Sequence, residues 1–341
     1  MAGKKEDGSM LSLVLYFAFW YLGNYYYNIY NKTALNETGG KTAGYAMTVS
    51  TMQLAVCTVY ALTLWLIRIN PITILGLLAP SKQSPPDLSA SDIPKMGVVA
   101  FCSAGAHSAS VFALNAGSVT FGQIVKSGEP VFAAVVNTIF YGKPPSLLKT
   151  LCLPIIVGGV GFACMKPDPV SGAYSLDFDI AALTAGCIAN GMAAFKGSEN
   201  KKLMSGGDLG SRLGGVGNQF AVTEILAFFI SLPIMFYMEG DKFGEFVKLF
   251  QSNQKLQFNL VMSGLTFYWY NELATMTIKK TGALTSSVAN TAKRVIVIVG
   301  VAVAMKKPLS YEEKVGAAVA VAGVLLYSVI DDLLGSKSKK S

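Results

Sequence analysis

The chain has 341 residues, of which 52% are hydrophobic and 14% charged, whereas a soluble protein carries about 25% charged residues. Together with a mean hydropathy of +0.46, this composition excludes an ordinary soluble protein. It predicts an all-α polytopic membrane protein surrounded by membrane lipid. The net charge of +8 does not indicate a nucleic-acid partner, because most of the cations lie at the ends of apolar segments.

Ten apolar segments are long enough to cross a bilayer, which takes about 20 helical residues each. In chain order they cover about residues 11–31, 44–67, 96–117, 119–141, 148–165, 177–196, 215–237, 257–278, 283–305 and 312–331. We therefore expect a polar N-terminal tail (1–10), a membrane domain of ten transmembrane helices (11–331) and a basic C-terminal tail (332–341).

The lysines and arginines at the span ends indicate the orientation. They are more numerous on the side that carries both termini, so the positive-inside rule predicts cytosolic termini. Residues 1–9 are short and polar and hold no recognisable leader or transit peptide. Either a targeting segment lies outside this sequence, or the protein needs none.

The two halves of the chain show a short internal match. A shift of 164 residues places the fourth and fifth segments on the ninth and tenth, and residues 157–160 on 321–324. Chance is the alternative explanation. A true repeat would give halves of five spans each, about 11–165 and 177–331, and an odd number of spans inverts one half relative to the other. Inverted repeats around a central substrate pocket are typical of secondary transporters.

Three cations lie inside these segments rather than at their ends: Lys126, Lys293 and Arg294. Each costs about 2.5–3.5 kcal/mol near the bilayer centre on insertion scales. An anion site would explain them, because arginine offers a planar fork to two oxygens and lysine adds a compact charge. Such a cluster suits a phosphate dianion better than a monocarboxylate.

The alternative is that these cations form structural ion pairs. Lys126 has an acid three residues further along the same helix, within reach of one helix face. Lys293 and Arg294 have no acid within one helical turn, so their partners would come from other spans. The candidate partners are Glu129, Glu224 and Glu272.

Four further polar residues are candidates for the same pocket, and three of them have a simpler explanation. His107 precedes Lys126 by 19 residues, which predicts that His107, Ser110 and Lys126 share one cavity; a buried core histidine is the alternative. Tyr270 brings a polar tip into the eighth span, although most aromatics in such a run pack. Lys196 ends the predicted sixth span, where a positive-inside anchor is the plain interpretation.

Several of these residues belong to a recognisable pattern. It consists of Trp20 and Tyr21 with residues 28–32, His107 followed by Lys126-x-x-Glu129-Pro130, residues 201–204, residues 270–274, and Asn290-x-x-Lys293-Arg294-Val295. Over about residues 11–331 the chain resembles the plastid phosphate translocators, the triose-phosphate/phosphate exchangers of the drug/metabolite transporter superfamily. The Lys293–Arg294 pair is the most specific part of the resemblance.

The resemblance implies ten helices in two inverted five-helix repeats with a central substrate pocket. It implies that Lys126, Lys293 and Arg294 hold phosphate, while His107, Ser110 and Tyr270 contact the rest of the substrate. The family usually has arginine where this chain has Lys196, which leaves substrate preference open and makes Lys196 a candidate for a second anionic group.

The function implied is strict counter-exchange of inorganic phosphate for triose phosphates and related C3 compounds, with 3-phosphoglycerate and then phosphoenolpyruvate as candidates. No cofactor or metal is implied. A nucleotide-sugar or other sugar-phosphate transporter of the endomembrane system is the alternative, and the Lys293–Arg294 pair argues against it. A membrane-embedded enzyme lacks support, because no metal-ligand cluster or nucleophile motif occurs. The sequence indicates no oligomeric state.

Two locations remain open from the sequence. The resemblance implies a plastid envelope or the outer membrane of a complex plastid. The endoplasmic reticulum is the alternative, because Lys337 and Lys339 resemble a dilysine retrieval signal and Asn31 and Asn36 fit the glycosylation pattern.

Overall fold

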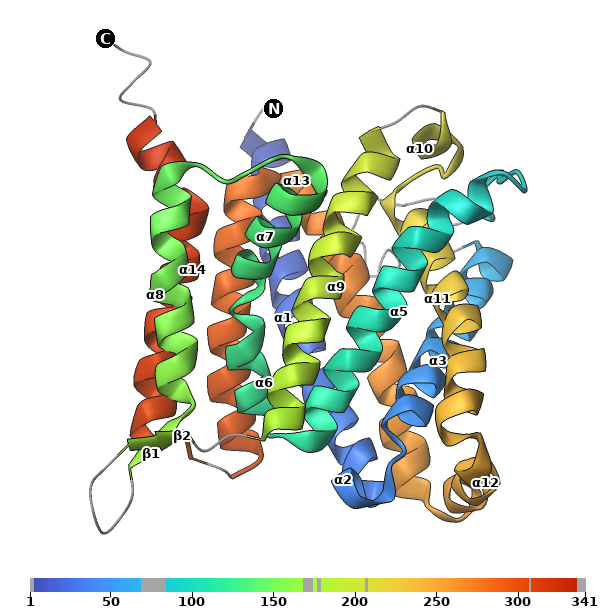
Figure 1. Ribbon diagram of the computed structural model, residues 1–341. Helices are drawn as coiled ribbons and strands as arrows, with labels where there is room; N and C mark the ends of the chain where they lie inside the picture. The colour runs from blue at the N-terminus through green and yellow to red at the C-terminus, as the bar shows by residue number, and fades with distance from the viewer. Residues whose placement is uncertain are drawn as a thin grey trace. The chain divides into compact units, whose positions relative to one another are not determined.

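The computed structural model describes residues 3–68, 84–167, 174–176, 179–205, 208–306 and 308–335. Most of them are helical (Figure 1). In chain order the elements are α1 (Gly3–Glu37), α2 (Gly40–Ala43), α3 (Ala46–Ile67), α5 (Asp92–Ala116), α6 (Val119–Lys126), α7 (Glu129–Tyr141), α8 (Leu147–Ala163), β1 (Met165–Pro167), β2 (Tyr174–Leu176), α9 (Ile180–Ser205), α10 (Leu209–Arg212), α11 (Val216–Glu239), a 3-10 turn (Gly240–Lys242), α12 (Phe243–Ser252), α13 (Gln254–Ala304) and α14 (Tyr311–Gly335).

Long apolar helices confirm an integral membrane protein. Within the described residues, four helical stretches are long and apolar enough to cross a bilayer, and Leu147–Ala163 is apolar but shorter. The four stretches are Ala46–Ile67, Asp92–Ala116, Val216–Ser252 and Tyr311–Asp331. A small antiparallel hairpin of β1 and β2, with Met165 opposite Leu176, was not predicted by the apolar pattern.

The expected fourth span, 119–141, is not one helix. It is divided into α6 and α7, with Ser127 and Gly128 between them. Pro130 lies in the first turn of α7, where its missing N–H costs little. In a continuous helix its ring would meet the carbonyl group of Lys126, four residues earlier. The proline therefore explains why the helix is interrupted at this point.

The expected eighth and ninth spans, 257–278 and 283–305, both fall within α13. Its 51 helical residues would extend about 76 Å at 1.5 Å per residue, more than twice the hydrocarbon thickness of about 30 Å. The segment thus contains enough residues for two crossings. A division between two compact units of the molecule falls within it, after Gly282.

The expected sixth span, 177–196, overlaps a helix that continues beyond residue 196. Helix α9 runs from Ile180 to Ser205, so Lys196 lies within the helix and not at its end. No proline interrupts this stretch, and a polar continuation can remain helical outside the membrane.

Residue contacts divide the chain into two compact units. Unit 1 contains Met1–Ala104 and Glu199–Gly282, and unit 2 contains Gly105–Ser198 and Ala283–Ser341. Each unit therefore takes segments from both halves of the sequence.

In unit 1, α3 and α11 pack along each other (Figure 1). Glu239 at the end of α11 accepts hydrogen bonds from the backbone N–H groups of Met47 (2.9 Å) and Thr48 (2.7 Å). These N–H groups belong to the first turn of α3, where no intrahelical partner exists. The contact therefore fixes the start of one helix to the end of another.

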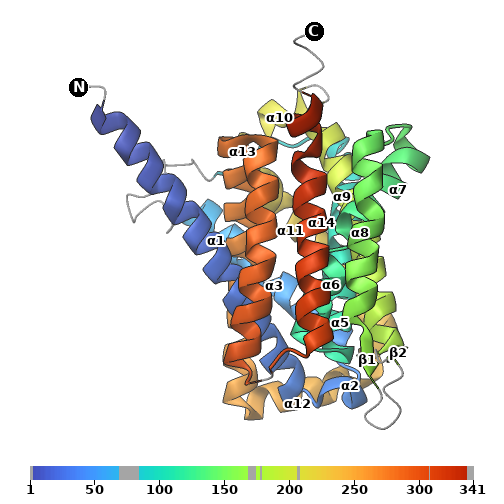
Figure 2. The same ribbon diagram turned by 90° about the vertical axis from the view of Figure 1, so that its left-hand side faces the viewer.

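Unit 2 contains a close antiparallel pair, α8 and α14, which lie side by side in both views (Figures 1 and 2). A Cβ atom added at Gly159 would lie 2.8 Å from the Cα of Ala320, and one added at Gly323 would lie 2.9 Å from Cγ1 of Ile156. Positions 156 and 159 become 320 and 323 under the shift of 164. The contact is thus reciprocal, as it is across a two-fold axis.

One of the two expected glycosylation sites is wrong. Asn31 lies within α1 and is only 1% exposed. Its amide donates to the hydroxyl of Tyr27 (2.9 Å) and accepts from the amide of Gln53 (2.9 Å), so it is part of a packed polar contact in unit 1. Asn36 is exposed in the last turn of α1. The expected dilysine residues, Lys337 and Lys339, lie outside the described residues.

Candidate anion-binding site

The interruption between α6 and α7 places two charged residues at facing helix ends. Lys126 is the last residue of α6, and Glu129 is the first residue of α7. A cation is favourable at a helix C-terminus and an anion at an N-terminus, because of the helix dipole. The break therefore stabilises the charge of both side chains.

Asn190 of α9 supports this break from within unit 2. It is 2% exposed, and its side-chain amide donates to the carbonyl oxygen of Val125 at 2.9 Å. Interrupting a helix at membrane depth frees backbone groups that need partners. Asn190 supplies one, and the sequence pattern did not predict this role.

The ion pair of the site joins Arg294 to Glu129. The Nη2 atom of Arg294 lies 2.7 Å from Oε2 of Glu129, and the two side chains are 7% and 40% exposed. Pairing with an acid of another span, which the sequence left open for Lys293 and Arg294, is thus confirmed for Arg294. Among the described residues no ion pair joins Lys126 to Glu129, and the two lie on different helices, so the alternative of an ion pair on one helix face does not hold.

The remaining two candidate cations lie in the same neighbourhood. Lys126 interacts electrostatically with Arg294 and Glu129, and Lys293 interacts with Arg294, Glu129 and Lys126. The fold thus brings three cations and one carboxylate together from α6, α7 and the second half of α13. Opposite charge stabilises such a group of cations, so it is suited to holding an anion.

Arg294 has a donor to spare. Its Nε atom is buried and has no hydrogen-bond partner among the described residues. The Nε–H and one Nη2–H point along the same edge of a guanidinium group, where they can bind two oxygens side by side. Glu129 contacts Nη2, so the Nε donor is available to an oxygen of an anion.

Three more predicted site residues belong to unit 2. His107 is 4% exposed in α5, and the hydroxyl group of Ser110 donates to the carbonyl oxygen of Ala106 at 2.7 Å. Lys196 is half-buried within α9. Their contact with substrate stays a prediction.

Tyr270 belongs to unit 1. It is 8% exposed, and its ring packs against Tyr27 and Phe267, with ring centroids 5.4 and 5.7 Å apart. A Cβ atom added at Gly23 would lie 3.0 Å from Cβ of Tyr270. The tyrosine is thus held by α1, and its role in binding stays a prediction.

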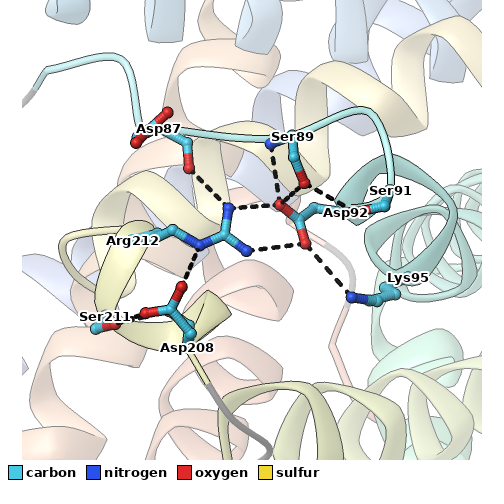
Figure 3. A network of polar contacts seen from close by, with 8 residues as sticks. All are labelled: Asp87, Ser89, Ser91, Asp92, Lys95, Asp208, Ser211 and Arg212. Atoms are coloured by element: carbon cyan, nitrogen blue, oxygen red, sulfur yellow. Dashed lines mark hydrogen bonds and ion pairs between the residues drawn. The ribbon is translucent and has the colours of Figure 1, made fainter.

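A second charged cluster, around Arg212, was not predicted (Figure 3). Arg212 binds both carboxylate oxygens of Asp92, at 2.6 and 3.1 Å, and Asp208 at 2.7 Å. These hydrogen bonds raise the pKa of the Arg212 guanidinium above its usual value, and those to Asp92 contribute most. The cluster ties α10 to the start of α5 across 120 residues of sequence, which no local spacing reveals. We interpret it as a structural clamp.

Among the described residues, no group of three or more His, Cys, Asp or Glu side chains is placed to hold a metal ion.

Comparison with known proteins relates the chain to a group of plastid transporters. A sequence profile described as the triose-phosphate transporter family matches residues 11–328. The chain is 30% identical to phosphoenolpyruvate/phosphate translocator 3 of Oryza sativa subsp. japonica, over 91% of this chain and 72% of that protein. It is 28% identical to the triose phosphate/phosphate translocator of non-green plastids from Brassica oleracea var. botrytis, over 96% and 74%. A crystal structure with 12% identity and a TM-score of 0.51, covering 94% of this chain and 99% of its own, is similar in fold.

Proposed function

Since the chain belongs to the triose-phosphate transporter family, we propose that it exchanges inorganic phosphate for triose phosphates and related C3 compounds by alternating access. The single observation that carries this proposal is the buried Arg294. Its Nε donor has no partner among the described residues, and it interacts electrostatically with Lys126 and Lys293. These three residues would hold the phosphate group that all such substrates share.

Strict exchange follows from the cost of moving an empty site. Alternating access must close the site before opening it on the other side. Closure without substrate would leave excess positive charge in a medium of low dielectric constant, at several kcal/mol per ion. A bound phosphate offsets this charge, so the loaded carrier changes state and the empty one does not. Inorganic phosphate and a sugar phosphate then drive each other's transport.

The proposed substrates share the charged end and differ in the remainder. His107, Ser110 and Tyr270 would contact the C3 portion. Lys196 would hold a second anionic group, such as the carboxylate of 3-phosphoglycerate or phosphoenolpyruvate. The lysine ammonium group is a point charge and lacks the planar donor pair of arginine, so it would select for the charge of the ligand more than for its geometry.

The test is uptake of labelled phosphate by purified protein in lipid vesicles. Vesicles loaded with phosphate should take up label, and empty vesicles should take up little. Equal uptake by both would contradict the exchange mechanism. In loaded vesicles, triose phosphate and 3-phosphoglycerate should compete with the label. Strong competition by UDP-sugar alone would favour the nucleotide-sugar alternative.

Ten crossings in two inverted repeats around a central pocket are part of the proposal. The reciprocal contact between α8 and α14 supports it, because inverted halves meet across a two-fold axis. For the location we propose a plastid envelope or the outer membrane of a complex plastid, in line with the chloroplastic relatives. The endoplasmic-reticulum alternative loses one argument, because Asn31 is buried.

A further inference from the structure

Glu129 occupies a position on Arg294 that a phosphate oxygen also needs. Its Oε2 atom accepts from Nη2 at 2.7 Å, while the adjacent Nε of the guanidinium has no partner among the described residues. A phosphate group binds arginine best through two parallel hydrogen bonds. On the Nε/Nη2 edge this geometry draws on Nη2, the atom that Glu129 now contacts.

We propose that Glu129 is the resident counter-ion of the empty site, and that an incoming phosphate displaces it from Arg294. This inference rests on the proposed function, because it concerns the same anion site. It assigns to Glu129 a role in selecting substrates by charge, beyond bracing the fold.

Two features of Glu129 fit a carboxylate that can leave its partner. Its side chain is 40% exposed, whereas that of Arg294 is 7% exposed. Glu129 is therefore the less enclosed partner of the pair and has more freedom to move. The residue also begins α7, where the helix dipole stabilises a negative charge without help from Arg294.

The carboxylate also lowers the positive charge that a substrate meets. Glu129 interacts electrostatically with Lys126 and Lys293 as well as with Arg294. Neutralising it raises the net charge of the cluster by one unit. Every anionic ligand should then bind more tightly, and a trianion such as 3-phosphoglycerate should gain more than a dianion such as triose phosphate.

The test compares four versions of the full-length purified protein: wild type, Glu129→Gln, Glu129→Asp and Asp331→Asn. The Gln variant keeps an oxygen that can accept from Arg294 but removes the charge. The Asp variant keeps the charge at the start of α7 on a shorter arm, so its hold on Arg294 is weaker. Asp331 pairs with Lys149 at 3.2 Å on α14 and α8, and serves as a matched ion pair in the same unit.

The measurement is equilibrium binding of inorganic phosphate, 3-phosphoglycerate and dihydroxyacetone phosphate. Glu129→Gln should lower the half-saturating phosphate concentration about tenfold and shift the preference towards 3-phosphoglycerate. Glu129→Asp should lower the half-saturating phosphate concentration by a smaller factor, and it tests the proposal by itself if the Gln variant does not fold. Asp331→Asn should bind as wild type does.

Unchanged or weaker phosphate binding in folded Glu129 variants would overturn the counter-ion role, as would an unchanged substrate preference in Glu129→Gln. Failure of the proposed function looks different, because wild type itself would then show no saturable phosphate binding.

Discussion

Arg294 differs from an arginine in an ordinary buried ion pair. Its side chain is almost fully buried, yet only one donor of its Nε/Nη2 edge has a partner among the described residues. Leaving a buried charged donor without a partner costs about 1–3 kcal/mol or more. Such a cost is typical of a binding site that a ligand completes. The neighbouring residue, Lys293, shares the electrostatic environment but offers a point charge without a planar fork.

At the residue scale, we predict that replacing Arg294 and replacing Lys293 have different effects on phosphate exchange. Arg294→Lys keeps the charge and loses the fork, so the half-saturating phosphate concentration should rise about tenfold, which corresponds to about 1.4 kcal/mol. Lys293→Ala removes a charge and should abolish exchange. Phosphate exchange in vesicles measures both.

The matched control for this pair is Lys149→Ala, which removes a cation from the ion pair with Asp331 and should leave exchange near the wild-type rate. Wild-type exchange in purified Arg294→Lys or Lys293→Ala protein would count against the site.

At the scale of the elements, the contact between α8 and α14 depends on individual glycines. A Cβ atom at Gly159 would lie 2.8 Å from the carbonyl oxygen of Gly316, whereas one at the adjacent Gly158 would meet nothing within 4 Å. Small residues let membrane helices approach closely. The structure shows that Gly159, Gly316 and Gly323 are the ones involved.

The two adjacent glycines provide a matched test of this contact. Gly158→Ala should leave stability unchanged or raise it by up to about 1 kcal/mol, because alanine is the better helix former. Gly159→Ala should lower stability by about 1–3 kcal/mol through overpacking against backbone. Apparent unfolding temperatures of the purified variants measure the difference. Equal temperatures for the two variants would show that α8 and α14 are further apart than the structure has them.

The helix break between α6 and α7 shows that an apolar pattern does not predict where a helix is interrupted. A run such as 119–141 is hydrophobic enough to read as one span, although Pro130 was visible as a signal of interruption. The merged helix α13 and the extended helix α9 show the same limit at span ends. Hydropathy locates the apolar residues of a span, but helical backbone can continue past them or stop within them.

At the scale of the whole molecule, each compact unit draws segments from both halves of the chain. Distant parts of the sequence must therefore be synthesised before either unit is complete. The proposed number of crossings, ten, is even and therefore places both termini on the same side of the membrane. The cation distribution predicts that this is the cytosolic side.

Tags fused to the two ends test this arrangement. In sealed vesicles of known orientation, protease should remove both tags or neither, and should remove both when the cytosolic face is outside. Removal of one tag with protection of the other would require an odd number of crossings. Solubilising the membrane provides the control, because both tags should then be cleaved.

The sequence by itself determined the class of protein, the positions of the long apolar segments and the identity of the cations within them. These follow from local properties, since apolar runs of about 20 residues and charges within them can be read without a fold. Only the tertiary structure decided which acid meets which cation. Glu129 and Arg294 are 165 residues apart, and Glu129 pairs with Arg294 rather than with its near neighbour Lys126. That choice depends on a broken helix and on the packing of α6, α7 and α13, which no spacing along the chain encodes.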